Sequence, residues 1–203
     1  MTRRALVSAA VALSAIAAGC GSSRPATATT HTSMPTTSTT ASGPGPLQAE
    51  ANSAAAGDIP DNQHFILFQN PRGGYSIKYP EGWAQQGSGD AVVIRDKNNI
   101  VRIVVGPATA PTRAAIEREV QALNGVKAQT APQAIKVSGK PAFKVVYSTR
   151  SAPSSVTGRR VTLVVNRYYL WNGGRRAVVD LGTPRGVDNV DAYRLMIESF
   201  RWR

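Results

Sequence analysis

Residues 21–46 contain almost no side chains from which a folded core can be built. Thirteen of these 26 residues are Ser or Thr, four are Pro, and none is aromatic. A segment that buries so little apolar surface cannot offset the entropy that it would lose on ordering. We therefore expect a disordered linker over residues 20–63 and a folded domain over residues 64–203.

The chain begins with two arginines and a short apolar segment. Arg3 and Arg4 precede an uncharged, mostly apolar run at residues 5–18. At about 1.5 Å per residue this run spans roughly 21 Å, which is less than the ~30 Å hydrocarbon core of a bilayer. The pattern predicts a secretory signal peptide over residues 1–19 and not a transmembrane helix. The paired arginines leave the general secretory route and the twin-arginine route both open.

Cys20 is the chain's only cysteine and stands where the signal peptide ends. A single cysteine excludes an internal disulfide and any multi-cysteine metal site. The residues before it resemble a bacterial lipobox, with Ala17 where such motifs usually have Leu. The resemblance implies a lipoprotein, acylated at Cys20 by chains such as palmitate and anchored to the extracytoplasmic face of the cell membrane. The alternative is an ordinary cleaved signal peptide with an unmodified cysteine.

Downstream of residue 63 the sequence alternates between apolar and polar residues, as half-buried strands do. Helical patterns occur at residues 112–124 and from Asp188 onward. Asn172-Gly-Gly174 lies between two apolar runs and predicts a tight hairpin. We expect strands at residues 64–69, 75–79, 91–95, 100–105, 134–137, 142–147, 160–171 and 175–181. Hairpin strands with two main helices indicate an α+β fold, an antiparallel sheet covered by helices.

Three segments of this domain resemble the PsbP-like family. Residues 74–83 (GYSIKYPEGW) are similar to its opening strand and Tyr-Pro-x-Gly-Trp turn. Residues 138–147 (SGKPAFKVVY) are similar to a turn and strand in mid-domain, and residues 196–202 (MIESFRW) to the last helix and its exit into a terminal strand. The resemblance implies an α/β/α sandwich with a central antiparallel sheet. It also implies a role without catalysis, since members include photosystem accessory proteins and bacterial envelope lipoproteins.

The matched motifs are structural, so the resemblance assigns no functional residue. We expect Trp83 in the core, after a turn at Gly82 that a side chain would block.

The domain holds few groups on which catalysis depends. His64 is its only histidine and stands near no recognisable nucleophile motif, so we expect it on the surface. Glu117 and Glu119 are two apart on a predicted helix and therefore point in different directions. Asp188 stands at a predicted helix start, where capping explains it. The glycine pairs lack the Lys of a P-loop, and metal-ligand spacing is absent. We expect no enzyme, no catalytic residue, no metal and no cofactor.

Positive charge is the remaining indication of a partner. The chain has 24 Lys and Arg against 12 Asp and Glu, a formal net charge of +12. On or next to the predicted hairpin, interleaved with aromatic residues, are five arginines: Arg159, Arg160, Arg167, Arg175 and Arg176. Such a surface fits anionic lipid headgroups, a cell-wall polymer or an acidic envelope protein. The alternative is a solvated, arginine-biased face whose aromatic side chains pack in the sheet. Nucleic acid is not expected as a partner of an exported lipoprotein.

The sequence predicts two alternative functions. The first is a lipid-anchored, non-enzymatic cell-envelope domain that binds or scaffolds a protein or an anionic polymer at the outer face of the plasma membrane. The second is a carrier or sensor of a small apolar ligand held between sheet and helix, which needs a pocket of about 300–1,000 Å³.

Overall fold

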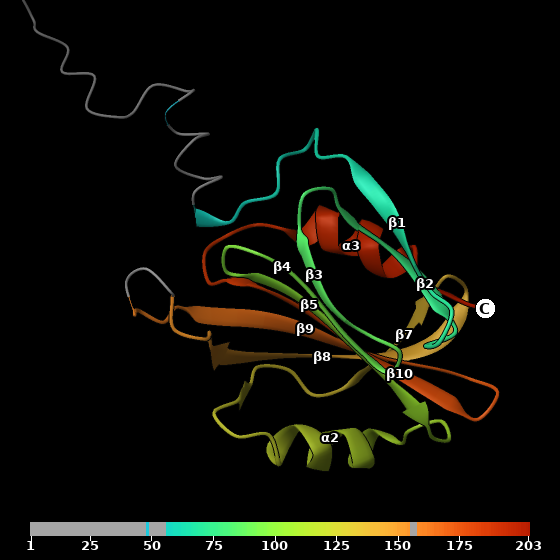
Figure 1. Cartoon of the computed structure of the whole chain (residues 1–203). Helices are drawn as coiled ribbons and strands as arrows, with labels where there is room; N and C mark the ends of the chain where they lie inside the picture. Colours follow the sequence, from blue (N-terminus) through green and yellow to red (C-terminus); the bar gives the residue numbers. More distant parts are fainter. Residues whose placement is uncertain (1–47, 49–55, 155–157) are drawn as a thin grey trace, which may run out of the picture. The chain divides into compact units, whose positions relative to one another are not determined.

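The structure is a computed structural model, which describes residue 48 and residues 56–154 and 158–203 (Figure 1). The predicted signal peptide, Cys20 and most of the predicted linker lie outside the described residues. No helix within the described ranges combines the length and the apolar character needed to cross a bilayer.

The described residues form two antiparallel sheets. A large sheet of eight strands has the order β3-β4-β5-β10-β9-β8-β6, with β7 also paired to β8, and a small sheet has the order β1-β2-β11. The small sheet consists of β1 (Phe65–Asn70), β2 (Tyr75–Pro80) and β11 (Arg201–Trp202). The large sheet consists of β3 (Ala84–Ser88), β4 (Ala91–Asp96), β5 (Asn99–Pro107), β6 (Lys127–Ala128), β7 (Gln133–Val137), β8 (Lys140–Arg150), β9 (Thr162–Asn172) and β10 (Arg175–Pro184).

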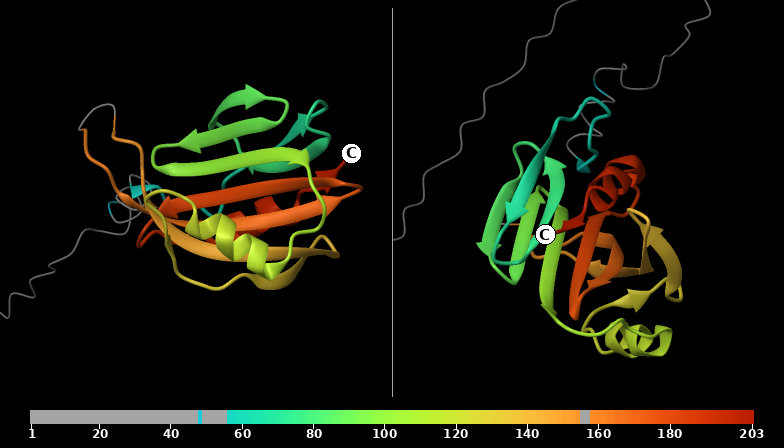
Figure 2. Two further views of the ribbon diagram at one scale, coloured as in Figure 1. Left: turned by 90° about the horizontal axis from the view of Figure 1, so that it is seen from below. Right: turned by 90° about the vertical axis from the view of Figure 1, so that its right-hand side faces the viewer.

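Helices α2 (Arg113–Gln121) and α3 (Val190–Glu198) cover opposite faces of the large sheet (Figures 1 and 2). Successive residues of a strand point to opposite faces, and the core contacts follow this rule. Tyr169 packs in a cluster with Ile116 of α2, whereas Tyr168 belongs to the cluster that contains Met196 of α3. The predicted α+β class is therefore confirmed.

The layer on the α3 side is mixed, because the small sheet shares it with the helix. After α3 the chain turns at Ser199, whose hydroxyl accepts a hydrogen bond from Lys78 N at 2.7 Å. Arg201 and Trp202 then pair with Ser76 and Tyr75 of β2. The expected α/β/α sandwich thus has one outer layer made of a helix and a three-stranded sheet.

The predicted strands all occur, and β3 and β6 are additional. Every residue of β3 is exposed and its sequence is Ala-Gln-Gln-Gly-Ser, so it carries no alternation of apolar and polar residues. Pairing with β4 alone makes it a strand. β6 is only two residues long, which is too short to show a periodic pattern of apolar residues.

Trp83 is 9% exposed and belongs to the main core cluster, which confirms its predicted place. Gly82 has φ +88°, a conformation that side chains rarely adopt, but a Cβ there would meet no atom within 4 Å. The expected turn at Gly82 is therefore confirmed, and a side chain is disfavoured there by the backbone conformation and not by lack of space.

A buried polar network attaches residues 57–59 to the domain. Asn189 Nδ2 donates to Gly57 O at 3.0 Å and to Thr183 Oγ1 at 2.8 Å, while its Oδ1 accepts from Ile59 N at 2.8 Å. Asn99 Nδ2 also donates to Gly57 O, at 2.6 Å. The chain is therefore already part of the folded body at Gly57, seven residues before the boundary that apolar patterning indicates, because side-chain amides hold this segment.

Candidate functional site

The five predicted arginines do not form one surface. Arg159 and Arg160 are exposed and precede β9, whereas Arg175 and Arg176 begin β10 beyond the other end of β9. At about 3.3 Å per residue, the eleven residues of β9 separate these pairs by roughly 35 Å. Arg167 lies between them in the middle of the strand.

Arg167 is a structural cation, because it is 3% exposed and bound to a buried carboxylate. Its Nε donates to Asp180 Oδ1 at 2.6 Å and its Nη2 to Asp180 Oδ2 at 2.8 Å. Burial opposes the charged guanidinium, but the hydrogen bonds and charge of Asp180 outweigh it and raise the pKa of Arg167 above its usual value. Arg167 is thus unavailable to a surface ligand, contrary to the sequence-based expectation.

Arg176 is half-buried and helps to attach α2 to the sheet. Its Nη1 lies 3.3 Å from Glu119 Oε2 on α2, and its guanidinium lies 5.6 Å from the centre of the Tyr169 ring. The Tyr169 hydroxyl donates to Glu119 Oε1 at 3.2 Å, and burial raises the pKa of Tyr169 to about 12. This arginine serves the fold as well.

Arg175 belongs to a different group of side chains, which we call the aromatic–cationic corner: Lys140, Trp171, Arg175, Arg201 and Trp202. The Arg175 guanidinium lies 5.6 Å from the centre of the Trp202 ring, and its Nη2 donates to Gly73 O at 2.7 Å. Trp202 in turn meets the buried Phe200 edge-on, with ring centres 5.3 Å apart. The corner thus combines half-buried indoles with cations.

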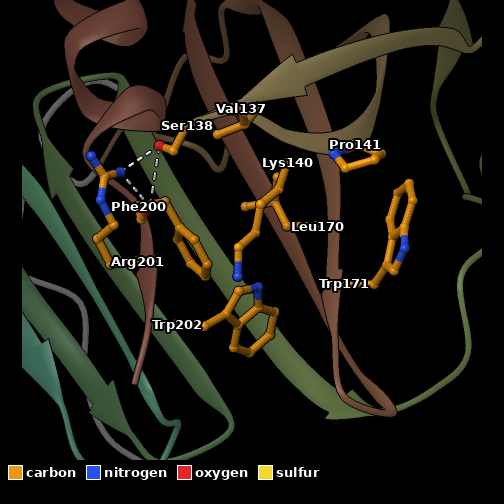
Figure 3. A pocket seen from close by; sticks show the side chains of 9 residues that line it. All are labelled: Val137, Ser138, Lys140, Pro141, Leu170, Trp171, Phe200, Arg201 and Trp202. Carbon is orange, nitrogen blue, oxygen red and sulfur yellow. Dashed lines mark hydrogen bonds between the residues drawn. The ribbon is translucent and has the colours of Figure 1, made fainter.

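A pocket of about 90 Å³ opens in this corner, between the β7–β8 turn, the end of β9 and β11 (Figure 3). Its lining residues are Val137, Ser138, Lys140, Pro141, Leu170, Trp171, Phe200, Arg201 and Trp202. The Lys140 side chain extends toward Trp202, and Trp171 stands on the other side of Lys140 (Figure 3). The volume suits a single functional group of a larger partner and not a whole small molecule.

Hydrogen bonds from side chains to backbone carbonyls hold the corner in place. The Ser138 hydroxyl donates to Glu198 O at 2.7 Å, and Arg201 Nη1 donates to Phe200 O at 2.8 Å and to Glu198 O at 2.6 Å. Arg201 also donates to the Ser138 hydroxyl. The Arg201 guanidinium therefore stabilises the turn between α3 and β11. Lys140, by contrast, forms no ion pair among the residues that the structure describes.

Sequence reasoning missed Lys140, Arg201 and Trp202 as site residues. They lie in two segments that were matched only to structural motifs of the PsbP-like family. The signal that was present is the aromatic and basic C-terminal run Phe200-Arg-Trp202.

The α3 side of the large sheet is closely packed, since Tyr193, Met196 and Ile197 are at most 4% exposed. On the α2 side a groove of about 370 Å³ lies between the helix and residues 128–132. Its lining mixes Glu117 with apolar side chains such as Val120, which suits an apolar ligand poorly.

His64 is on the surface, as expected, with its side chain 74% exposed and its Nδ1 3.1 Å from Glu81 Oε2. Within the described ranges, no group of three histidines, cysteines or acidic residues is placed to hold a metal ion.

No protein-family model and no curated protein matches this sequence. Among solved structures, the domain resembles the solution structure of cyanobacterial PsbP from Synechocystis sp. PCC 6803, with 16% identity and a TM-score of 0.51 over 73% of this chain and 99% of that chain. This domain has the PsbP fold. The sequence resemblance to the PsbP-like family is thus confirmed at the level of the fold.

Two further structures match with lower TM-scores. The Ran-binding protein Mog1p of Saccharomyces cerevisiae has 10% identity and a TM-score of 0.43, over 70% of this chain and 96% of that chain. LpqN of Mycobacterium tuberculosis, described as involved in cell envelope biogenesis, has 15% identity and a TM-score of 0.36, over 70% and 86% of the two chains. At these identities the comparisons concern the fold alone.

Proposed function

We propose that this chain is a lipid-anchored, non-enzymatic module of the bacterial cell envelope, which binds an anionic protein or polymer through its aromatic–cationic corner. The position of the corner carries the proposal. Residues 57–59 enter the domain beside Asn99, at one end of β5. Arg175 pairs with Pro107 at the other end of β5, nine residues or about 30 Å away. Anchorage through the N-terminal segment therefore leaves this corner at the end of the domain that is farther from the anchor.

The chemistry of the corner supports an anionic partner. An indole offers a flat apolar face to a sugar ring or an acyl chain, and a neighbouring ammonium or guanidinium attracts carboxylate or phosphate groups. Lys140 extends over the pocket and forms no ion pair within the described part of the chain, so its charge is available to a ligand. The small volume favours capture of a protruding acidic group of a macromolecule.

Lipid anchorage rests on Cys20 and is tested by mass spectrometry of the N-terminal peptide. We expect a peptide that begins at Cys20 and carries acyl chains. An unmodified peptide beginning further downstream would overturn the anchor.

Binding is tested by co-sedimentation with purified cell-wall sacculi and by affinity capture from solubilised envelopes, each at rising salt. Lys140→Glu should weaken binding about tenfold, and salt should weaken the wild type, because charges at an interface are screened. Lys136→Glu is the matched control, since Lys136 is exposed on β7 only four residues away but lines no part of the pocket. Equal losses in the two variants would contradict the assignment of the site to the corner.

A further inference from the structure

Exposed basic side chains also gather at the end of the domain where residues 57–59 enter. They come from the β4–β5 hairpin, the β8–β9 connection and the residues that follow β10. We call this set the basic end: Arg95, Lys97, Arg150, Arg159, Arg160 and Arg185. Among the described residues, the acids of these loops and of the entering segment are Asp58, Asp96 and Asp188. Positive charge is therefore in excess here.

Strand pairing and hydrogen bonds bring these loops together. Arg95 and Lys97 line a pocket of about 600 Å³ with residues 151–154 of the β8–β9 connection. Arg160 Nη1 donates to Ser151 O at 2.8 Å. Arg150 pairs with Thr162, whose carbonyl accepts from the backbone N–H of Arg185 at 2.9 Å. The basic end is thus one surface built from three separate loops.

The anchored segment joins the domain at this same surface. Asn99 lines the 600 Å³ pocket and also donates to Gly57 O. Thirty-six residues lie between Cys20 and Gly57. For the linker that the composition predicts, 36 residues give a reach of about 30–35 Å, so the basic end can touch the headgroups to which Cys20 is anchored.

We infer that the basic end docks on anionic phospholipid headgroups and so orients the aromatic–cationic corner away from the membrane. The inference rests on the lipid anchor of the proposed function. Tethering to the same membrane gives an effective concentration in the millimolar range, which makes weak electrostatic contacts sufficient. Guanidinium groups suit phosphate, because their N–H donors match its oxygens.

The test measures vesicle binding by the chain from residue 20 to residue 203 with Cys20→Ser, which removes any acylation. Vesicles contain either phosphatidylcholine alone or phosphatidylcholine with one third phosphatidylglycerol. The test variant is Arg95→Gln/Lys97→Gln/Arg185→Gln at the basic end. The matched control is Arg72→Gln/Lys136→Gln/Arg203→Gln, which removes three exposed charges near the other end.

We expect salt-sensitive binding to the anionic vesicles and little binding to phosphatidylcholine. A basic residue near an anionic surface contributes roughly a fivefold change in partitioning. The basic-end variant should therefore bind at least about tenfold more weakly, while the control changes by less than about threefold. Circular dichroism checks that both variants are folded.

Three results would overturn the inference. Equal losses in both variants show that only the total charge matters, and binding independent of phosphatidylglycerol or of salt removes the electrostatic contact. Stronger competition by soluble polyphosphate than by anionic vesicles shows that the basic end recognises a phosphate polymer and not lipid. Because Cys20 is absent from this experiment, none of these results depends on whether the anchor or the corner was assigned correctly.

Discussion

Replacing Asp180 by Leu should strongly destabilise the domain, because it leaves a buried arginine without its carboxylate. Asp180 is 5% exposed and Arg167 is 3% exposed, and two hydrogen bonds of 2.6 and 2.8 Å join them across β10 and β9. After the replacement, the nearest remaining carboxylate is that of Glu119, 3.8 Å from Arg167 Nη1 and already shared with Arg176.

The size of the effect follows from the cost of an uncompensated buried charge. Removing one partner of a buried ion pair typically costs about 3–5 kcal/mol, whereas replacing both by apolar side chains is often nearly neutral. For a domain of this size, that corresponds to a fall in Tm of roughly 10–15 °C. Arg167→Met/Asp180→Leu should recover most of the stability that either single replacement loses.

The assay is urea unfolding followed by circular dichroism, with both single variants and the double variant forming a double-mutant cycle. The coupling free energy between the two sites should be about 3 kcal/mol, since each single variant leaves the other buried charge without its partner. A loss below about 1 kcal/mol for Asp180→Leu, or a double variant as unstable as the sum of the singles, would refute the reasoning. Either result would show that the Asp180 carboxylate does not compensate the buried charge of Arg167.

Three further predictions concern stability. Trp83→Ala should cost about 3–5 kcal/mol in urea unfolding, because this core side chain is 9% exposed, and unchanged stability would contradict its core assignment. Burial raises the pKa of Tyr147 and Tyr168 to about 12, whereas the unfolded chain releases these protons near pH 10. The free energy of unfolding should therefore keep its full value below pH 10 and fall toward pH 12. Tyr168→Phe should reduce this fall in an alkaline titration, and an unaltered profile would show that Tyr168 does not contribute. Asn189→Ala should accelerate hydrogen exchange at the Ile59 amide, which loses its acceptor, and unchanged protection there would argue against the network.

Much of the fold could be predicted from local patterns. Asn172-Gly-Gly174 does form the β9–β10 turn, with φ of +53° at Gly173 and +78° at Gly174, the conformation that favours glycine in a two-residue hairpin loop. Thr112 caps α2, accepting from Ala115 N at 3.2 Å. The start of α3 differs from the prediction, because Asn189 and not Asp188 occupies the N-cap position. The Asn189 side chain makes no capping hydrogen bond and donates instead within the buried network, while Asp188 Oδ1 accepts from Val190 N.

The candidate site was predicted only in small part. Of the five arginines chosen from the hairpin, Arg175 alone reaches the corner, because successive residues of a strand face opposite sides of the sheet and hairpin ends lie far apart. Lys140 and Trp202 are 62 residues apart and meet only because β11 folds back onto β2.

By itself, the sequence determined where a core is possible, where the two helices and most of the strands lie, and which cysteine is available for an anchor. These properties depend on side chains within a few positions of one another, so periodicity and composition report them. Tertiary structure decided which charges are buried, paired or left to a ligand, because each such outcome depends on strand register and on contacts between distant segments. Arg167 and Arg175 show this, since the same residue type in the same hairpin is a buried ion-pair partner at one position and an indole-bound surface cation at the other.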